Sequence, residues 1–492
     1  MCKSLAPRRL NHDAERRATN TKSVVDCLGS WYPLRNSIGL SATITTFCIL
    51  WIPVILKSPR KAAIWFILVS VLLDVLSFGV LIPVIPSLIK EFTAKGDWLA
   101  SAIVNVVGGE FAGTPKSLAA TCIGLFGFVW ALMHFFCAPI LGALSDVYGR
   151  RRVLLISCFG LGIDYILMGF SQNLTWLFVG RIISGITASG FATAGAYIAD
   201  VTPPEKRAAA FGMFGAAFGI GFVVGPALGG LLFDLGPSLK GLLGEYSNRL
   251  PFWVSAVLTL ANVLYGYFVL PESLAPEHRK PFSWSRANPI GSLRLLRAHP
   301  GMLGLAMVYF LYQLAHQVLN NVFVLYTENR YAWTPQNVGV ALGVVGILNI
   351  VVQGGLVRPA LKRCGERALL YAGLGCGVVG YALYGLADTS WKFWAATPVF
   401  SLMAFFTPAI QGLMSRRLGP TVQGQLQGAN GSLTGIAGMI GPLLFPGIYA
   451  YSLNPNTPLN TPGLPFLVAS GCLVIAILIA LMTLRPAKTT TE

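Results

Sequence analysis

The stretch GALSDVYGRR, residues 142–151, decides the fold, because it lies between two long apolar segments. It combines an acid, Asp146, with a glycine, Gly149, and two arginines, Arg150 and Arg151. A segment this polar between two membrane helices must lie at a water-facing surface of the bilayer. We therefore expect a short loop here, with a turn that Gly149 permits and with Asp146 capping a helix N-terminus. We expect Arg150 and Arg151 to pair with acids or with lipid phosphates.

The composition of the whole chain indicates a membrane protein. Of its 492 residues, 54% are hydrophobic and only 11% are charged, and the mean hydropathy is +0.65. Soluble proteins are typically about 25% charged, so this chain cannot cover a globule with polar surface. Its apolar runs repeatedly exceed the ~20 residues that cross a bilayer as a helix. The fold class that we predict is an all-α, polytopic membrane protein.

The net charge of +17 does not indicate a nucleic-acid partner. Lys and Arg cluster in short loops at alternate helix ends, which is the pattern that sets membrane topology. The sequence has no basic domain with interleaved aromatic residues to bind nucleic acid. Its nine cysteines form no CxxC pair, so we expect no disulfide framework, no metal and no cofactor. The expected partners are the lipid bilayer, protons and a small-molecule substrate.

Twelve apolar segments follow from Lys61 onward. With the first helix entering from the cytoplasm, the loops richest in Lys and Arg fall on the inner side of the cell (plasma or inner) membrane. We therefore expect both ends of the twelve-helix core to be cytoplasmic. The expected helices are 62–89, 121–141, 153–171, 175–199, 208–233, 251–270, 301–327, 338–357, 368–387, 393–413, 424–447 and 464–484.

Three segments lie outside this helical pattern. Residues 1–60 form a polar and then moderately apolar extension of uncertain role. The loop 90–120 is unusually long for a helical hairpin. The stretch 271–300 is rich in proline and polar residues, and we expect it to be a central cytoplasmic loop between two sets of six helices.

The two sets of six helices repeat one another. Glycines and prolines recur 216 residues apart in three separate regions, at Gly149 and Gly365, Pro204 and Pro420, Gly212 and Gly428, and Pro226 and Pro442. This constant offset predicts two six-helix halves, 61–270 and 301–484, followed by a cytoplasmic tail, 485–492. Halves related by an axis along the membrane normal place a substrate site between them, near the middle of the bilayer.

Three charged residues lie deep within the expected helices. Asp74 and Asp164 fall near the middle of the first and third helices, and Arg181 is about two turns into the fourth. A charge at the bilayer centre costs at least ~2.5–3.5 kcal/mol, so such residues usually face a cavity or a partner. Each acid could be neutral and donate to a backbone carbonyl, or it could carry a transported proton.

Two histidines add groups that titrate near neutral pH. His134, alone in the apolar second helix, is typical of a hydrogen-bonded packing residue. In the seventh helix, polar residues follow an i, i+3, i+4, i+7 spacing that aligns them on one face. We expect this face to line the substrate cavity and its histidine to share in proton coupling; its members are Gln313, His316, Gln317 and Asn320.

Taken together, these motifs resemble the tetracycline/proton antiporter branch of the major facilitator superfamily. The resemblance covers nearly all of 62–484. It includes LLDVLSFGVLIPVIPSLIKEF (72–92), GALSDVYGRRRVLL (142–155), GRIISGITASGFATAGAYIAD (180–200) and FGMFGAAFGIGFVVGPALGG (211–230). It implies twelve membrane helices and proton-coupled export of a small amphipathic organic solute or drug by alternating access.

The resemblance also implies roles for particular residues. Asp74, Asp164 and Arg181 match charged groups that line the translocation path. A second set matches the loop that latches the cytoplasmic gate: Gly142, Asp146, Gly149, Arg150 and Arg151. A third set matches the antiporter signature of the fifth helix, where the glycines would allow close packing and the proline a bend: Gly221, Gly225, Pro226, Gly229 and Gly230.

Two positions depart from the family. Asn349 stands where the tetracycline exporters carry an eighth-helix histidine, and Gly377 stands where they carry a ninth-helix aspartate. Because those groups serve coupling and substrate binding in the family, the resemblance does not name the solute, and a tetracycline-like compound is one candidate. We assign Asn349 to the substrate cavity.

Two other functions compete with proton-coupled export. A facilitator or symporter for an endogenous metabolite is favoured by the departures at Asn349 and Gly377. A receptor or scaffold that moves nothing has no need of acids in the middle of a membrane, so Asp74 and Asp164 argue against it. An enzyme is not expected, because the sequence shows no nucleophile–base pair, metal cluster or phosphate loop. We expect the protein to function as a monomer.

Overall fold

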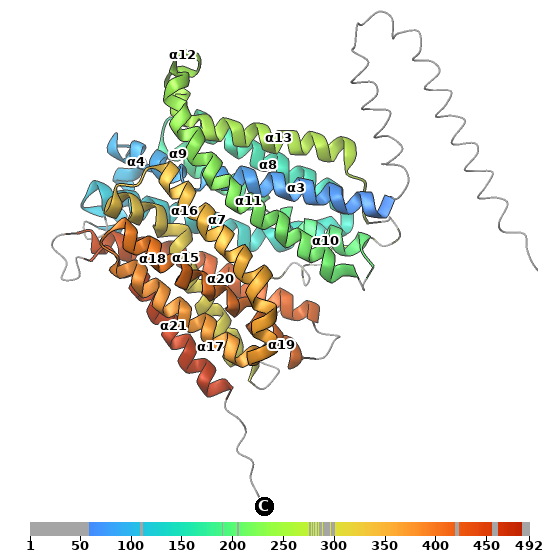
Figure 1. The fold of residues 1–492 in the computed structure, drawn as a ribbon. Helices are drawn as coiled ribbons and strands as arrows, with labels where there is room; N and C mark the ends of the chain where they lie inside the picture. Colours follow the sequence, from blue (N-terminus) through green and yellow to red (C-terminus); the bar gives the residue numbers. More distant parts are fainter. Residues whose placement is uncertain are drawn as a thin grey trace, which may run out of the picture. The chain divides into compact units, whose positions relative to one another are not determined.

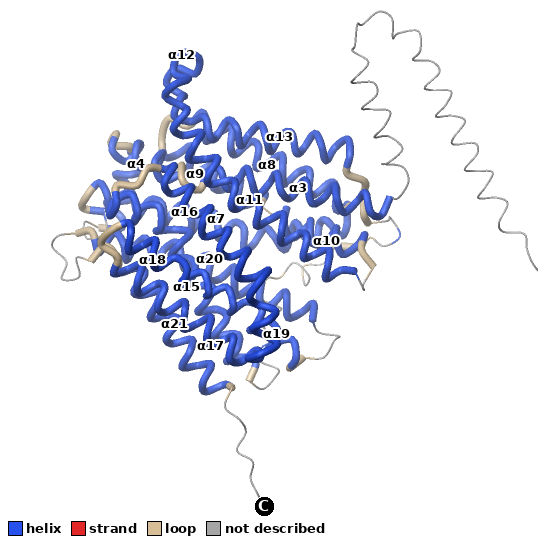
Figure 2. The backbone as a smooth tube through the Cα atoms, in the orientation of Figure 1, coloured by secondary structure: helices blue, strands red, loops and turns tan. Residues whose placement is uncertain are grey.

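The structure is a computed structural model that describes residues 59–484, apart from 109–111, 189, 204–205, most of 275–300, 419–422 and 455–460. The chain separates into residues 1–62 and 63–492, and the description below concerns the second unit. Nearly all of the expected extension 1–60, and the expected tail 485–492, lie outside the described residues. Every regular element in the described part is a helix (Figure 2).

The elements of the first half run from blue to green in Figure 1. They are α3 (Pro59–Leu81), α4 (Ile85–Ala94), α5 (Trp98–Val107), α7 (Pro115–Tyr148), α8 (Arg150–Phe170), α9 (Leu174–Thr187), α10 (Gly190–Val201), α11 (Arg207–Leu235), the short turns η3 (Gly236–Leu239), α12 (Lys240–Leu243) and η4 (Gly244–Arg249), and α13 (Leu250–Val269).

The elements of the second half run from yellow to red in the same view. They are α15 (Met302–Tyr331), α16 (Pro335–Val351), the π-helical turn η7 (Val352–Leu356), α17 (Val357–Leu386), α18 (Ser390–Ser401), the 3-10 turn η8 (Leu402–Phe405), α19 (Phe406–Arg416), α20 (Gln423–Ser452) and α21 (Leu464–Thr483).

Eleven helical stretches of the described residues are long and apolar enough to cross a membrane. One of them, Pro335–Leu386, has 52 residues. At 1.5 Å per residue it would be roughly 78 Å long, more than twice the ~30 Å of a bilayer core. Gly365 within it has a φ of 76° and a ψ of 171°, so the stretch is two helices joined by a glycine turn. The predicted twelve membrane helices are thereby confirmed.

Gly149 makes the same kind of turn 216 residues earlier. Its φ of 102° and ψ of 151° end α7 and begin α8 without any intervening loop. A φ this positive is readily adopted by glycine and strained for other residues. The expected loop over 142–151 is therefore wrong, because the chain is helical up to Tyr148 and the turn is a single residue. Asp146 consequently lies in the last turn of α7 and does not cap a helix N-terminus.

The expected loop 90–120 is also wrong in large part. Helix α4 continues to Ala94, α5 forms a further helix, and α7 begins at Pro115. Asp97 caps α5 by accepting from the N–H of Leu99 at 2.8 Å, and it also accepts from the N–H of Leu174 at 2.9 Å. The second contact ties this segment to the start of α9. The polar residues of this segment predicted a loop, but the structure is largely helical past the end of the apolar stretch.

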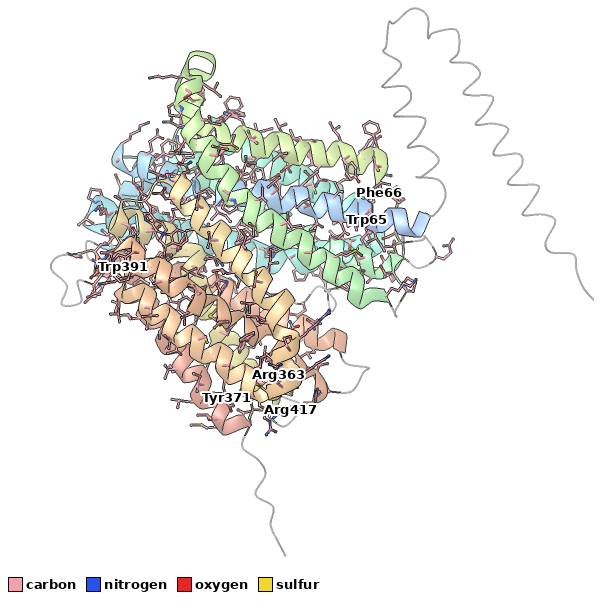
Figure 3. All side chains as sticks on the ribbon, viewed as in Figure 1. Trp65, Phe66, Arg363, Tyr371, Trp391 and Arg417 are labelled. Carbon is pink, nitrogen blue, oxygen red and sulfur yellow. The ribbon has the colours of Figure 1, made fainter. Side chains whose placement is uncertain are left out.

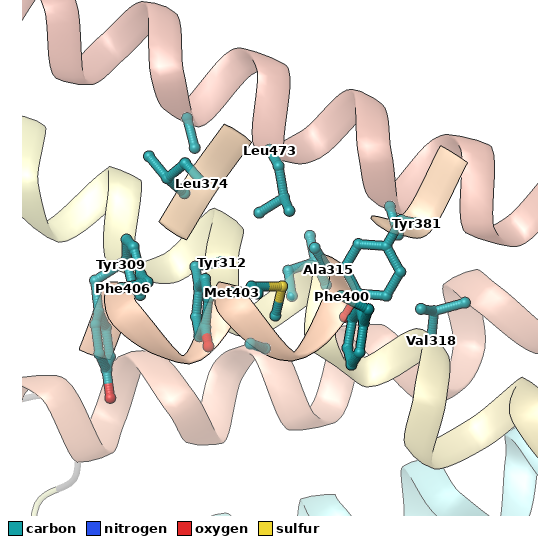
Figure 4. Close-up of a cluster of buried hydrophobic side chains, with 14 of the residues drawn as sticks. Tyr309, Tyr312, Ala315, Val318, Leu374, Tyr381, Phe400, Met403, Phe406 and Leu473 are labelled. Atoms are coloured by element: carbon teal, nitrogen blue, oxygen red, sulfur yellow. The ribbon is translucent and has the colours of Figure 1, made fainter. Parts of the chain in front are cut away.

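Each half has its own hydrophobic core. The larger cluster comes mostly from α15 to α21, and it stacks Tyr312 on Phe406 with ring centroids 3.8 Å apart (Figure 4). Two smaller clusters, one around Phe126 and Tyr165 and the other around Tyr197, come from the first half. The larger cluster also includes Ala120 of α7, with Ile123 packed against it, so the two halves share part of this core.

The halves meet along two pairs of helices, α7 with α20 and α11 with α16. Gly124 of α7 lies against Pro442 of α20, and Gly339 of α16 lies against Pro226 of α11. Small residues of this kind let membrane helices approach closely. Adding 216 to the residue numbers of α7 gives the region of α16, and adding 216 to those of α11 gives the region of α20. Each pair is thus the image of the other, as a two-fold axis along the bundle requires.

The two ends of the bundle differ in charge. We call the end that carries the turns at Gly149 and Gly365 the basic end; Arg363 and Arg417 lie there in Figure 3. Exposed tryptophans mark both ends, with Trp65 (63% exposed) near the start of α3 and Trp391 (67% exposed) at the opposite end. Tryptophan is enriched where a membrane meets water, so these side chains bracket the apolar span.

Candidate functional site

A cavity of about 800 Å³ lies between the two halves. Its walls come from α7 and α10 of the first half and from α15 and α20 of the second. Four glycines of α20 form one stripe along its wall: Gly428, Gly431, Gly435 and Gly438. Small-molecule sites in proteins typically measure ~300–1,000 Å³, so this cavity can hold a drug-sized solute.

The cavity extends toward the basic end. Gly142 of α7, near that end of the helix, belongs to its lining, as do Gln427 and Gly428 near the start of α20. On the far side of the cavity, Gly124 packs against Pro442 and closes the two halves together. At the opposite end, Lys90 of the first half and Glu328 of the second form an ion pair at 2.5 Å. These two contacts thus join the halves at the end opposite the basic one.

The polar face expected on the seventh helix, α15, divides between two environments. Gln317 lines the cavity, and Gln313 donates to Thr434, which also lines it, at 2.9 Å. Asn320 is exposed and is not among the lining residues. Asn349 of α16 is half-buried and does not line the cavity either.

His316 does not join the cavity. Its ring lies parallel to that of Tyr312, and its Nδ1 is 3.4 Å from the hydroxyl of Tyr381, within the aromatic core of the second half. Consecutive residues of a helix are 100° apart, so His316 and Gln317 lie at opposite edges of the polar arc. Gln317 falls on the cavity side of that arc and His316 on the core side.

His134, interpreted from sequence as a packing residue, lines the cavity instead. It stacks on Trp130 with ring centroids 5.2 Å apart and an angle of 8° between the planes. The two aromatic residues are four positions apart on α7, a spacing that places side chains next to one another on a helix. This i, i+4 pair was the sequence signal that could have identified the wall.

Asp74 of α3 is held by neutral groups. Its Oδ1 accepts from Nδ2 of Asn262 at 2.8 Å, and the thiol of Cys158 lies 3.4 Å from its Oδ2. The same Asn262 accepts from the hydroxyl of Ser70 through its own Oδ1 at 2.7 Å. Asn262 is an isolated amide in the apolar run of α13, and it is the sequence signal that could have identified a partner for Asp74. No cation is paired with Asp74 among the described residues.

Asp164 of α8, by contrast, is paired. It is fully buried, and its Oδ2 lies 3.0 Å from Nη2 of Arg181 on α9. The arginine side chain is only 12% exposed, so both charges are removed from solvent together. The family resemblance implies that both residues line the translocation path, and the structure brings them into direct contact.

The turn at Gly149 is surrounded by acids. Arg150 pairs with Asp146 at 2.5 Å and with Asp200 of α10 at 3.2 Å. Glu272, just after α13, accepts from the backbone N–H groups of Arg150 at 2.8 Å and Arg151 at 3.4 Å. It therefore caps α8 in the place that sequence analysis gave to Asp146. A negative side chain at a helix N-terminus is favourable by ~0.3–1 kcal/mol.

Arg151 does not pair with an acid in the described structure. It donates to the carbonyl oxygens of Gly266 and Tyr267 at the end of α13, and its guanidinium lies over the ring of Tyr267. Together with Glu272, this contact binds the start of α8 to the end of α13. The turn at Gly149 is therefore one rigid unit that joins several helices of the first half.

The signature glycines of α11 lie against other helices. Gly221 and Gly225 contact Val75 and Gly79 of α3, and Gly229 lies against the backbone of Val80. Gly230 faces the other way, toward Gln336 of α16. The first three hold α11 on α3 within one half, and Gly230 contributes to the contact between halves.

Twelve membrane helices in two repeated halves, with a large cavity between them and buried charges within the helices of the first half, define a membrane transporter. The Major Facilitator Superfamily pattern matches residues 67–442. The class C tetracycline resistance protein of Escherichia coli is 38% identical over 393 residues, which are 79% of this chain and 90% of that protein. The class B protein of Escherichia coli is 34% identical over 391 residues, 78% of this chain and 88% of that protein.

Among solved structures, the human organic anion transporter MFSD10 has a TM-score of 0.66, covering 86% of this chain and 100% of that chain. Its sequence is 23% identical, so this likeness is one of fold. The chain belongs to the Major Facilitator Superfamily, in the branch of the tetracycline resistance proteins. It is a multi-pass membrane transporter and not an enzyme.

Proposed function

We propose that this protein exports a small amphipathic organic solute in exchange for protons, by alternating access. The observation that carries the proposal is the large cavity between the two halves, with the acids Asp74 and Asp164 within the membrane helices of one half. The relatives are named for tetracycline resistance, so a tetracycline-like substrate is the first to test. Because one chain supplies both halves, a monomer is sufficient.

The contacts of the two acids assign them different roles. Protonating Asp164 would leave the buried guanidinium of Arg181 without its counter-ion, and breaking a buried pair costs about 3–5 kcal/mol. Asp74 has only neutral partners, so it can bind and release a proton without stranding a cation. We therefore assign proton carriage to Asp74, and to the Asp164–Arg181 pair the task of holding α8 and α9 in register. His316 does not line the cavity, so we assign it no part in proton coupling.

The gating elements follow from the two ends of the bundle. The cavity extends toward the basic end, which we place in the cytoplasm, and the Lys90–Glu328 pair closes the outer end. Opening outward requires this pair to separate while the basic end closes around the turn at Gly149. Both core termini are then cytoplasmic, as the distribution of Lys and Arg predicts.

A facilitator or symporter of an endogenous metabolite is the second candidate, and Gly377 favours it. A Cβ at this position would lie 2.6 Å from a methyl of Leu473 and 2.8 Å from the sulfur of Met403. The ninth-helix aspartate of the tetracycline exporters therefore has no room here without repacking. Any coupling of transport to protons must therefore depend on the first half. A chain without proton coupling would only equalise the substrate concentrations on the two sides of the membrane.

Transport in vesicles decides between the candidates. Inverted membrane vesicles that contain the protein are energised to acidify their interior, and uptake of tetracycline is followed. We expect uptake above the external concentration, together with substrate-dependent proton release. An ionophore that collapses the pH gradient should abolish this accumulation of tetracycline. Uptake that only reaches the external concentration, with or without a gradient, would establish the facilitator.

The orientation is tested by labelling two positions. In a chain without other cysteines, Lys95→Cys, near the end of α4 and 64% exposed as lysine, should react with a membrane-impermeant maleimide on intact cells. A chain that retains only the native, exposed Cys364 should react in inverted vesicles and not on intact cells. Labelling of both positions from outside would refute the proposed orientation and the number of crossings between them.

Neutralising the gate should separate transport from binding. Asp146→Asn removes one of the two carboxylates on Arg150 without touching a residue that lines the cavity, so we expect transport to fall by about 10-fold or more while substrate affinity stays nearly unchanged. Glu366→Gln, beside the equivalent turn at Gly365, is the matched control and should transport normally. A variant at Asp146 that transports normally but binds poorly would reverse the assignment.

A further inference from the structure

A second, smaller cavity lies at the seam where α7 of the first half meets α20 of the second. Its volume is about 280 Å³, and its walls include Val107 of α5, Thr121 and Leu125 of α7, and Leu443 and Gly447 of α20. No charged side chain is among its described lining residues. Drug-sized sites typically measure ~300–1,000 Å³, so this groove, just below that range, suits a slender apolar chain.

The groove faces lipid and not the large cavity between the halves. Leu125 and His134 are nine positions apart on α7, which places them on opposite sides of the helix. His134 lines the large cavity, so Leu125 points away from it. On the other wall, Leu443 is 47% exposed within a membrane helix, where the surrounding medium is hydrocarbon. Both walls therefore meet the bilayer.

The depth of the groove places it in the leaflet at the end opposite the basic one. Helix α7 has 34 residues, so it is about 51 Å long and extends about 10 Å beyond each side of a ~30 Å bilayer core. Thr121 and Leu125 lie about 9 and 15 Å from its start at Pro115. Helix α5, with 10 residues, is too short to cross, and its Trp98 is 63% exposed, as is typical at the boundary between membrane and water. The groove thus lies just below the lipid headgroups.

The other seam, between α11 and α16, explains why this groove exists. Pro226 of α11 and Pro442 of α20 hold equivalent positions, each with its carbonyl oxygen against a glycine of the facing helix. Five residues further on, α11 carries Leu231 and α20 carries Gly447. A Cβ on Gly447 would meet no atom within 4 Å. The groove is therefore the space into which the chain places a leucine at the other seam.

We infer that one acyl chain of a phospholipid, from the leaflet opposite the basic end, occupies this groove. An empty apolar groove would leave its walls without contacts, and a lipid chain is the neighbour that can supply them. A chain seated there touches α7 of one half and α20 of the other, so it favours the conformation in which these helices are together. The site follows from the fold, whereas its effect on transport rests on the proposed alternating access.

Native mass spectrometry tests the site on the full chain, reconstituted in phosphatidylethanolamine and phosphatidylglycerol and then extracted in mild detergent. Gly447→Leu fills the groove from α20 and Leu125→Trp fills it from α7, so each should retain one phospholipid fewer than the native chain. Gly471→Leu is the matched control, because a Cβ there also meets no atom within 4 Å but lies on α21, outside the groove, and it should retain as many as the native chain.

Two results of this measurement would overturn the inference. The first is equal phospholipid retention by the native chain and both groove-filling variants. The second is a dimer of the native chain that becomes a monomer in Gly447→Leu, which would assign the groove to a second copy of the protein.

Spin labels test the effect of the lipid on conformation. In a chain without other cysteines, Lys116→Cys and Asp388→Cys place labels at exposed positions of different halves, at the end opposite the basic one. Adding the same lipids to delipidated protein should lower the population of the longer inter-label distance by at least about two-fold. Gly447→Leu should not respond. Lipid retention without this response would refute the conformational effect, whereas retention without proton-driven uptake in vesicles would refute export and leave the lipid site standing.

Discussion

Asp74→Asn is expected to abolish pH-driven accumulation while leaving slow downhill exchange. The amide can keep the contact with Asn262 and fill the same space, but it cannot bind and release a proton. With coupling removed, the substrate inside inverted vesicles should only equal that outside. Initial rates and final ratios of tetracycline uptake, with and without a pH gradient, separate these two effects.

The control for Asp74→Asn is Asp234→Asn, an exposed acid at the end of α11 that should transport like the native chain. If both Asp74→Asn and Asp164→Asn keep full proton-driven uptake, the acids of the first half do not carry the proton. The antiport mechanism proposed above would then be wrong. Loss of uptake only in Asp164→Asn would assign the proton to the paired acid.

Gly229→Ala should destabilise the protein and remove transport. The added methyl would overlap the carbonyl oxygen of Val80 in α3, and a backbone atom cannot move aside as a flexible side chain can. Overpacking of this kind costs about 1–3 kcal/mol or more. We expect a lower thermal unfolding midpoint of the purified protein and a lower yield of folded chain in the membrane.

Gly212→Ala on the same helix is the matched control for Gly229→Ala. A Cβ there meets no atom within 4 Å, and alanine is a better helix former than glycine by about 1 kcal/mol. This variant should be as stable as the native chain or slightly more so. Equal unfolding midpoints for the two variants would show that α11 does not depend on its close contact with α3.

The fold was largely predictable from sequence because its strongest signals are local. Apolar length and the charge of alternate loops define twelve helices, and the offset between Gly149 and Gly365 defines the repeat. Helix ends were predicted poorly. Residues such as Asp146 and Lys90 are polar and form ion pairs near the ends of the bundle, yet the backbone stays helical there. A turn of one residue leaves no sequence signature beyond the glycine itself.

The site was less predictable, because its partners are distant in sequence. Asn262 bonds to Asp74 across 188 positions, and Glu272 caps α8 across 122. Which acid meets which base is decided by helix packing, and spacing within one helix cannot reveal it. The same limit applies to His134 and His316: both lie on apolar helices, and only the rotation of each helix decides which one meets the cavity.

The turns at Gly149 and Gly365 point to a history of gene duplication. They share one backbone geometry, yet the first is enclosed by three acids, whereas the only ion pair described beside the second joins Glu366 to a largely exposed Arg416. The duplicated copies have therefore diverged, with one keeping a charged lock and the other released from that task. A chain with this division can change the side chains of the second half that line the cavity, such as Gln317, without altering the charged turn at Gly149.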